Sequence, residues 1–416
     1  KKKNSISRVV INKDTRLSGY IYEPALTAGF ISMGINVVLV GPLPTPALTL
    51  LSKSLRADFS VMITASHNPF FDNGLKFFSN QGYKISTEDE NKIEDYFFNY
   101  NFDNYKIKHS RYGKAVRLKD AMGRYSEALK RSADRDLDYS KIKVTLDCAN
   151  GAAYKVAPEV LFEMGVDLHT IADKPSGTNI NDRCGSLFPN KASQVVKKKK
   201  CNIGICLDGD GDRVILIDEK GDELKGEELI FIFANYYLKN KSLKKRSKIV
   251  TNEIANFGLD IALNKLGLKL IRVKVGDKNI LQEIQKNNHL FGGEPSGHFI
   301  FRDDLLIGDG MTTAIRIMSI MLKEGKKLSE LKKGLDLLSV LDINQKIDRE
   351  RFLQNEDKIY RNLNSLLANK KIFFNIRPSG TESVLRVNLQ YYKRNIKVNV
   401  LNKLKTNIIK IISDAC

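Results

Sequence analysis

The chain has 416 residues, a length at which a single hydrophobic core no longer suffices, so we expect three or four domains. Hydrophobic residues make up 42% of it, yet no stretch approaches the roughly 20 apolar residues of a membrane helix, and we expect no membrane association. The five cysteines are scattered without CxxC spacing, which argues against a zinc site or a disulfide framework and favours the cytoplasm.

The formal net charge of +20 has two explanations. A basic surface can attract nucleic acid or anionic substrates, whereas a composition rich in Lys, Asn and Ile gives the same excess without any function. The lysines are spread along the chain, with small clusters at 197–200 and 244–246, and no aromatic residues alternate with basic ones. We expect no nucleic-acid partner and keep a basic nucleic-acid-binding protein as the alternative from another class.

In chain order, strands alternate with helices. The first strands are expected at Arg8–Asn12, Asn36–Val40 and Asp58–Thr64. Helices are expected between them, at Tyr22–Met33 and Ala47–Leu55. Such alternation is typical of parallel strands joined by crossover helices in a doubly wound sheet, where ligands bind beyond the carboxyl ends of the strands.

The pattern restarts twice and then changes. The second group of elements is expected at Lys141–Asp147, Pro158–Met164, Asp167–Ile171 and Ile203–Leu207. The third is expected at Lys248–Thr251, Gly258–Leu266, Lys269–Lys274 and from Asp277. The last is expected at Val340–Ile347, Glu350–Leu367, Ile372–Ile376, Val384–Gln390 and Val398–Ser413. The predicted class is α/β, with three similar doubly wound α/β domains and a small C-terminal α+β domain around a central cleft. The expected domains are residues 1–138, 139–239, 240–337 and 338–416.

An acidic loop follows the apolar strand at 203–207. Asp208, Asp210 and Asp212 alternate with glycines, which let the backbone curl so that three carboxylates face one point. Like charges so close repel one another unless a cation is bound, and hard oxygen ligands suit magnesium or calcium. An EF-hand is a rival because Glu219 stands at loop position twelve, and a solvated acidic turn is another. The strands on both sides of the loop favour a metal site in an α/β sheet.

Three further polar loops carry candidate residues. Ser66 and His67 follow a strand and could supply a nucleophile beside an imidazole, although these types are also common in turns. A glycine-flanked loop at 292–298 offers a carboxylate, a hydroxyl and an imidazole for sugar hydroxyls, or is a plain turn. The loop at 377–382 begins with Arg377, whose guanidinium suits a phosphate, with a polar hairpin as the alternative.

Together and in this order, the four loops resemble the phosphoserine, metal, sugar and phosphate loops of the α-D-phosphohexomutase superfamily. The resemblance covers nearly the whole chain. Further segments are similar to the branch of that superfamily that acts on glucosamine phosphates, at Lys13–Gly19, Gly41–Pro46, Ser66–Phe78, Asp147–Ala152, Asn179–Asn181, Lys274–Asp277 and Gly308–Gly310. The family usually opens with a Gly-rich FGTDGIRG-like segment, which this sequence lacks, and the chain does not begin with Met. We therefore expect N-terminal residues to be missing.

The resemblance implies an intramolecular phosphotransferase of the isomerase class. It would interconvert glucosamine 6-phosphate and glucosamine 1-phosphate through a phosphoserine and a bisphosphate intermediate, feeding UDP-N-acetylglucosamine and cell-wall synthesis. Pro295 and Pro378 depart from the branch pattern, so a phosphomannomutase/phosphoglucomutase with the same mechanism is the alternative. The implied cofactors are Mg²⁺ and a hexose 1,6-bisphosphate activator. The implied partner is a small sugar phosphate, and the chain would be a monomer or homodimer.

The resemblance also assigns roles residue by residue. The phosphate would be carried by Ser66, which would also complete the metal site formed by Asp208, Asp210 and Asp212. The remaining catalytic residues would be His67, Lys76 and Arg213, with Lys76 as the general base and its pKa lowered by the nearby cation. Substrate would be bound by Lys274, Glu294, Ser296, His298, Arg377, Ser379, Gly380 and Thr381, and the supporting residues would be Arg16 and Asp309.

Overall fold

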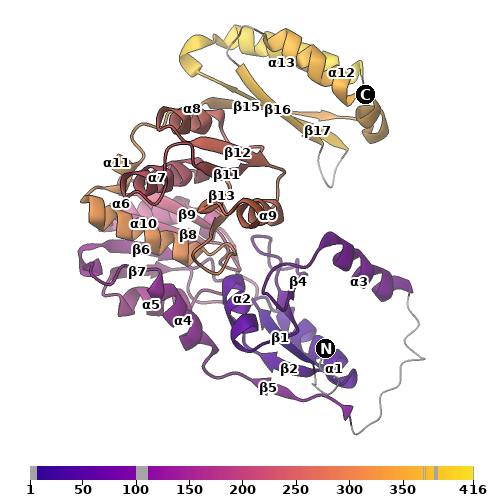
Figure 1. Cartoon of the computed structure of the whole chain (residues 1–416), viewed down its shortest axis with the longest axis vertical. Coiled ribbons are helices and arrows are strands. Elements are labelled where there is room, and N and C mark those ends of the chain that lie inside the picture. The colour runs from indigo at the N-terminus through magenta and orange to yellow at the C-terminus, as the bar shows by residue number, and fades with distance from the viewer. Residues whose placement is uncertain (1–6, 100–110, 369, 371, 379–382, 416) are drawn as a thin grey trace. The chain divides into compact units, whose positions relative to one another are not determined.

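The computed structural model describes residues 7–99, 111–368, 370, 372–378 and 383–415 (Figure 1). The chain forms two compact units. Unit 1 contains Lys1–Leu243 and Gly276–Lys333, and unit 2 contains Lys244–Val275 and Gly334–Cys416. Among the helices in the described part of the chain, none combines the length and the apolar character that crossing a bilayer requires.

The first sheet of unit 1 has its parallel strands at the centre. Its strands are β1 (Arg8–Lys13), β2 (Asn36–Leu39), β3 (Phe59–Ile63), β4 (Leu75–Ser79) and β5 (Ala115–Arg117), in the order β4-β3-β1-β2-β5. Only the edge strand β4 runs antiparallel to its neighbour. The sequence analysis did not predict β4, which carries Lys76.

Helices cover both faces of this sheet. α1 (Gly19–Ser32) and α2 (Thr45–Ser54) pack on the strands, whereas α4 (Ala121–Arg131) packs against α2 and α3 (Thr87–Asn99) has no buried residue. Leu26 and Phe30 of α1 pack against Val9 and Val61, whereas Ser52 of α2 hydrogen-bonds to Ser60. Because successive strand residues point to opposite faces, α1 and α2 lie on opposite sides, as a doubly wound sheet requires.

The second sheet of unit 1 repeats this plan and positions the acidic loop. Its strands are β6 (Lys143–Asp147), β7 (Asp167–Ile171), β8 (Ile203–Leu207), β9 (Val214–Asp218) and β10 (Glu223–Leu224), in the order β10-β9-β8-β6-β7. The accompanying helices are α5 (Val156–Glu163) and α6 (Asn190–Lys199), and α7 (Gly226–Lys239) follows β10 in the chain. Every residue of β8 is buried, so its apolar run reads as a central strand, and its carboxyl end leads directly into Asp208.

The rest of unit 1 places the predicted sugar loop. It comprises α9 (Asp277–Asn287), a hairpin of β13 (Phe291–Gly293) and β14 (Phe299–Phe301), α10 (Gly310–Glu324) and α11 (Leu328–Leu331). Phe233 of α7 makes ring contacts with Phe291, Phe299 and Phe301, and these contacts fix the hairpin against α7. The loop at 294–298 is the turn of this hairpin.

Unit 2 combines a parallel strand pair with the C-terminal α+β region. The pair is β11 (Lys248–Asn252) and β12 (Lys269–Val273), connected by α8 (Phe257–Lys265). The C-terminal elements are β15 (Ser339–Lys346), α12 (Arg349–Leu367), β16 (Ile372–Pro378), β17 (Val384–Tyr391) and α13 (Val398–Ser413), and the antiparallel strand order is β15-β17-β16. One apolar cluster joins α12 and α13 to this sheet. The predicted class of doubly wound α/β regions followed by a small α+β region is confirmed.

Candidate active site

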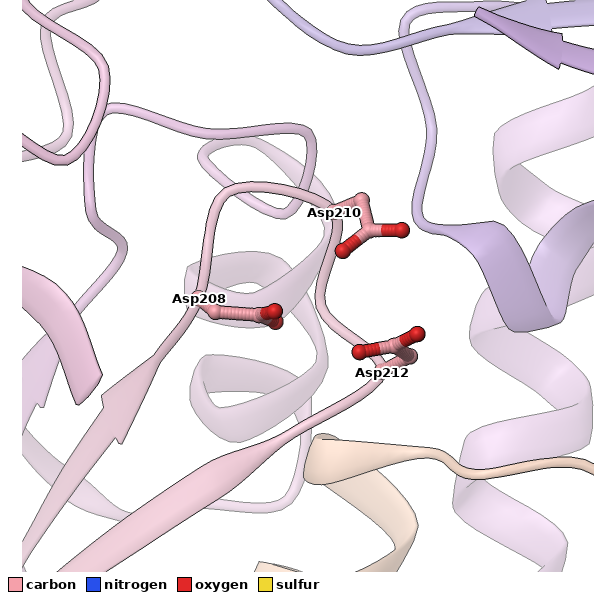
Figure 2. A group of neighbouring side chains, drawn as sticks. All are labelled: Asp208, Asp210 and Asp212. Carbon is pink, nitrogen blue, oxygen red and sulfur yellow. The ribbon is translucent and has the colours of Figure 1, made fainter. Parts of the chain in front are cut away.

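The acidic loop lies between β8 and β9 and brings its three carboxylates to one place. Asp208, Asp210 and Asp212 are buried, and one oxygen from each lies within 4.8 Å of the others. Figure 2 shows the three side chains around a common space. Gly211 adopts a φ of +71°, and a Cβ on Gly209 would come within 2.5 Å of a neighbouring carbonyl oxygen, so the curl requires both glycines.

Burial and mutual repulsion set the charges of this loop. Burial raises the pKa of Asp208 well above its usual range, and the carboxylates of Asp212 and Asp210 raise it further. For Asp212, burial acts in the same direction, but Lys76 and His298 outweigh it and hold the pKa well below the usual range. The three carboxylates therefore carry negative charge that the neighbouring basic residues compensate only in part.

The donor set fits a divalent cation. Asp210 Oδ1 and Asp212 Oδ1 are buried without a hydrogen-bond partner, which is costly for carboxylate oxygens. Three buried carboxylates within ligand distance of one point, two of them with an unused oxygen, match the hard oxygen ligands that Mg²⁺ and Ca²⁺ prefer. Metal binding by this loop is thus consistent with the chemistry of the protein's own residues.

Ser66 lies directly against the acidic loop. It follows β3, is buried, and its Oγ donates a hydrogen bond to Asp208 Oδ2 at 2.9 Å. Its φ of +52° is in the left-handed region, which is uncommon for serine. The Ser66 N–H bonds to Thr64 Oγ1 at 2.9 Å, so the loop holds the serine in this conformation and directs its hydroxyl to the carboxylates.

Arg16 organises the backbone around Ser66. Its buried guanidinium pairs with Asp14 at 2.9 Å and donates to the carbonyl oxygens of Ser66 and Asn68, both at 2.9 Å. It also donates to the carbonyl oxygen of Asp72 at 3.0 Å and to that of Pro69. The Arg16 side chain, which follows β1, therefore binds four carbonyl groups of the serine loop.

Lys76 on β4 reaches the acidic loop from the other side. Its Nζ lies 2.6 Å from Asp210 Oδ2 and 3.5 Å from Asp212 Oδ2. Burial lowers the pKa of Lys76, but the charges of Asp210 and Asp212 outweigh burial and raise it above its usual value. The sequence analysis expected a pKa lowered by a bound cation. That expectation stays a prediction, because the shift in this structure comes from burial and the carboxylates alone.

His67 and Arg213 meet beside the same loop. Arg213 Nη1 lies 2.8 Å from His67 Nδ1, and the Arg213 N–H donates to Asp208 Oδ1 at 3.2 Å. Burial and the Arg213 charge lower the pKa of His67, which favours the neutral imidazole as an acceptor. The two residues thus connect the serine loop to the acidic loop.

The hairpin loop places the predicted sugar-binding residues. Ser296 Oγ donates to Glu294 Oε2 at 3.0 Å, and the Gly276 N–H donates to Glu294 Oε1 at 3.4 Å. His298 is buried with Nδ1 3.9 Å from Asp212 Oδ1, so the hairpin adjoins the acidic loop. Burial lowers the pKa of His298, but Asp212 and Asp277 outweigh burial and raise it.

Asp309 lies at the start of α10 rather than facing the acidic loop. Its Oδ1 accepts from the N–H groups of Met311 and Thr312, at 3.0 and 3.1 Å, and so caps the helix. Its Oδ2 accepts from the Tyr125 hydroxyl at 2.9 Å. Burial raises its pKa to about 7. Asp309 thus caps α10 directly after Gly308, whose backbone contacts the His298 ring.

The remaining predicted substrate residues belong to unit 2. Lys274 follows β12 and is exposed, and Arg377 is half-buried in β16. Ser379, Gly380 and Thr381 lie outside the described residues. The assigned roles of these five residues stay predictions.

Two residues of the site were not singled out from the sequence. Thr45 Oγ1 donates to Asp210 Oδ2 at 2.6 Å, and Asn181 Nδ2 donates to the carbonyl oxygens of Ser66 and Asn68, at 2.9 and 3.0 Å. Both lie in segments that resemble the family, but those segments carried no role. Their burial beside the serine and acidic loops is the signal that identifies them.

Comparison with protein families gives three matches in chain order. Residues 1–104 match "Phosphoglucomutase/phosphomannomutase, alpha/beta/alpha domain I", residues 123–221 match domain II of the same family, and residues 225–336 match domain III.

Individual proteins agree with these matches. The chain is 45% identical over 385 residues to the phosphoglucosamine mutase of Geotalea uraniireducens, covering 92% of this chain and 85% of that protein. A phosphoglucomutase/phosphomannomutase family protein of Burkholderia thailandensis superposes with a TM-score of 0.81 at 20% identity, over 98% of this chain and 89% of that one. N-acetylphosphoglucosamine mutase of Aspergillus fumigatus, solved with GlcNAc-6P and magnesium, superposes with a TM-score of 0.64 at 18% identity, over 89% and 92%. At such identities the two structures show a shared fold.

Proposed function

The chain belongs to the phosphoglucosamine mutases of the α-D-phosphohexomutase superfamily, and we propose that it interconverts glucosamine 6-phosphate and glucosamine 1-phosphate. It is an enzyme of the isomerase class. The observation that carries the proposal is the buried hydroxyl of Ser66, 2.9 Å from Asp208 in a loop whose other carboxylates keep unpartnered oxygens. A serine in that position is set to carry a phosphoryl group next to a cation.

We propose Mg²⁺ as the cation, held by Asp208, Asp210, Asp212 and an oxygen of the Ser66 phosphate. When bound, it would act as a Lewis acid that neutralises charge on the phosphoryl group. The magnesium complex of the Aspergillus fumigatus mutase supports this choice, although the two proteins share only 18% identity.

The chemistry follows from a phosphorylated Ser66. A free hydroxyl oxygen of the sugar monophosphate attacks phosphorus, the bond from phosphorus to Ser66 Oγ breaks, and a hexose bisphosphate forms. After the sugar reorients, Ser66 Oγ attacks the other phosphate and the product leaves with one phosphate. The number of phosphoryl groups is conserved, so a hexose 1,6-bisphosphate is needed only to load Ser66.

Lys76 is proposed to take the proton of the attacking hydroxyl and return it in the second half-reaction. Its Nζ pairs with Asp210 and Asp212, in the same loop whose Asp208 accepts the Ser66 hydroxyl, and this supports the proposal. Because Asp210 and Asp212 raise its pKa, it accepts a proton only after these charges are compensated. Arg213 and His67 are proposed to stabilise the transferring phosphoryl group.

The sugar and its second phosphate need separate contacts. We propose that Glu294, Ser296 and His298 hold sugar hydroxyls, with Asp309 supporting them. Lys274 is proposed to contact the substrate, and Arg377 with Ser379, Gly380 and Thr381 to bind the non-reacting phosphate. We also propose the four domains expected from the sequence, at residues 1–138, 139–239, 240–337 and 338–416. The product is proposed to supply UDP-N-acetylglucosamine in the cytoplasm.

The test is turnover with Mg²⁺ and a catalytic amount of glucose 1,6-bisphosphate, offering glucosamine 6-phosphate, glucose 6-phosphate and mannose 6-phosphate side by side. The proposal expects a preference for the amino sugar, and Ser66→Ala should lose at least about 10³-fold in rate. Preference for glucose or mannose would make the chain a phosphoglucomutase/phosphomannomutase instead. Salt-dependent DNA binding without turnover would favour the nucleic-acid alternative.

A further inference from the structure

Two ion pairs connect the segment after β4, from Lys84 to Glu90 in the first turn of α3, to the start of α9, both inside unit 1. Lys84 Nζ lies 2.5 Å from Asp277 Oδ2, and Lys278 Nζ lies 2.7 Å from Glu90 Oε2. All four side chains are partly buried, so these pairs are better shielded than ordinary surface pairs. The backbone of Lys84 is itself fixed by a β-bridge to the buried Phe78.

Only one of the two pairs, Lys84 with Asp277, contacts a residue of the active site. Asp277 Oδ2, which binds Lys84, lies 3.9 Å from His298 Nε2. The other imidazole nitrogen, Nδ1, lies 3.9 Å from Asp212 Oδ1 of the acidic loop. His298 thus stands between two carboxylates at equal distances, one in the metal loop and one at the start of α9.

The imidazole has packing contacts but no hydrogen bond at Nε2. His298 Nε2 is buried and has no hydrogen-bond partner, so Asp277 is the group that faces it. A Cβ on Gly308 would come within 2.1 Å of the imidazole Cε1, so the backbone packs directly against the ring. Lys84, Asp277 and His298 also line a cavity of about 250 Å³.

We propose that Lys84 is a positioning residue for the mutase reaction, acting through Asp277 to set the place of His298; this rests on the proposed function. Asp277 Oδ1 accepts the Lys278 N–H at 3.0 Å, and Lys84 binds Oδ2, so both oxygens are held. Without Lys84, Oδ2 is free to turn towards Nε2 and form a direct hydrogen bond. The imidazole then moves away from Asp212, and a shift of about 1 Å at such a position costs up to about 10²-fold in rate.

The competing explanation is that both ion pairs simply tether α9 to the segment after β4. The chain offers a matched control for this, because Glu90→Gln breaks the second pair between the same two segments without touching Asp277 or His298. A tether predicts equal effects of Lys84→Met and Glu90→Gln. Positioning predicts that only the first affects catalysis.

Steady-state kinetics of the full chain separate the two. We expect Lys84→Met to lower kcat about tenfold with KM changed less than about twofold, and Lys84→Arg to recover most of the loss. Glu90→Gln should stay within about twofold of wild type in both constants. Lys84→Met and Asp277→Asn should be non-additive when combined, because they act on one contact. Equal losses in Lys84→Met and Glu90→Gln would overturn the proposal.

A readout without turnover distinguishes failure of this proposal from failure of the assigned reaction. The chain has five histidines, so ¹³C/¹⁵N-histidine labelling gives few imidazole signals, and His298→Gln identifies the one of interest. The His298 resonances should shift in Lys84→Met and not in Glu90→Gln. An inactive wild type with this shift would reject the mutase assignment and keep the positioning contact, whereas unchanged resonances would reject the positioning role.

Discussion

The buried carboxyl of Asp309 should make the stability of the folded chain depend on pH. Its pKa is about 7 in the folded chain against an ordinary value of 3.8, chiefly because of burial. Between these pH values the folded chain binds a proton that the unfolded chain has lost. Stability is therefore highest below about pH 4 with respect to this group, and it falls as pH rises through about 7.

The size of the effect follows from the two pKa values. The difference between 3.8 and about 7 corresponds to about 4 kcal/mol of unfolding free energy, since each tenfold change in proton affinity is worth about 1.4 kcal/mol. Asp309→Asn keeps the oxygen that caps α10 and an amide that can bond to Tyr125, but it carries no charge at any pH. The variant should therefore lose this slope and equal or exceed wild type in stability near pH 8.

The assay is hydrogen exchange of the α10 amides at several pH values between about 4 and 8, corrected for intrinsic exchange rates. It reports on the helix itself, which matters because a chain with two compact units need not unfold in one step. Asp348 is a matched control, since it caps α12 through the N–H groups of Glu350 and Arg351 but is exposed. Asp348→Asn should keep the wild-type slope. Parallel curves for wild type and Asp309→Asn would refute the reasoning.

Three further predictions concern the active site. Asp208→Asn removes a carboxylate whose pKa is raised by burial and by its neighbours, so the variant should be more stable than wild type in EDTA. The rise in Tm that Mg²⁺ gives to wild type should be lost in this variant. Arg16→Lys loses most of the bonds to the serine-loop carbonyl groups, so kcat should fall about 10- to 100-fold and protease should cleave the loop faster. Gly308→Ala forces a Cβ against the His298 ring and should lower Tm by several degrees, as thermal unfolding will show.

The sequence identified those features that short-range patterns determine. β7 and β8 were predicted with their observed ends because apolar runs with turn residues on both sides define them. The acidic loop could also be assigned, since three carboxylates alternating with glycines have few uses other than metal binding. Edge strand β4 was not predicted because the residues Leu75–Ser79 show no clear alternation of apolar and polar side chains. Helices α7 and α10 were not predicted because short apolar runs do not distinguish a buried helix from a strand.

The parts of the site that escaped depend on contacts distant in sequence. Thr45 and Asp210 are 165 positions apart, and Asn181 and Ser66 are 115 apart, so no local pattern marks these pairs. Lys76 likewise pairs with Asp210 without any local pattern in the sequence that marks the pair. Its distance from Asp210 is set by the antiparallel pairing of β4, which the sequence analysis did not include.

The conformation of Ser66 explains why so many distant residues converge on its loop. A serine with a φ of +52° costs about 1 kcal/mol or more, and it persists only where its surroundings enforce it. Here Arg16 and Asn181, from two different α/β regions, both donate to its carbonyl oxygen, and its own N–H is bound as well. The backbone is thus restrained on both sides while the hydroxyl stays directed at Asp208. All these groups belong to unit 1, so residues of that unit hold the serine next to the acidic loop.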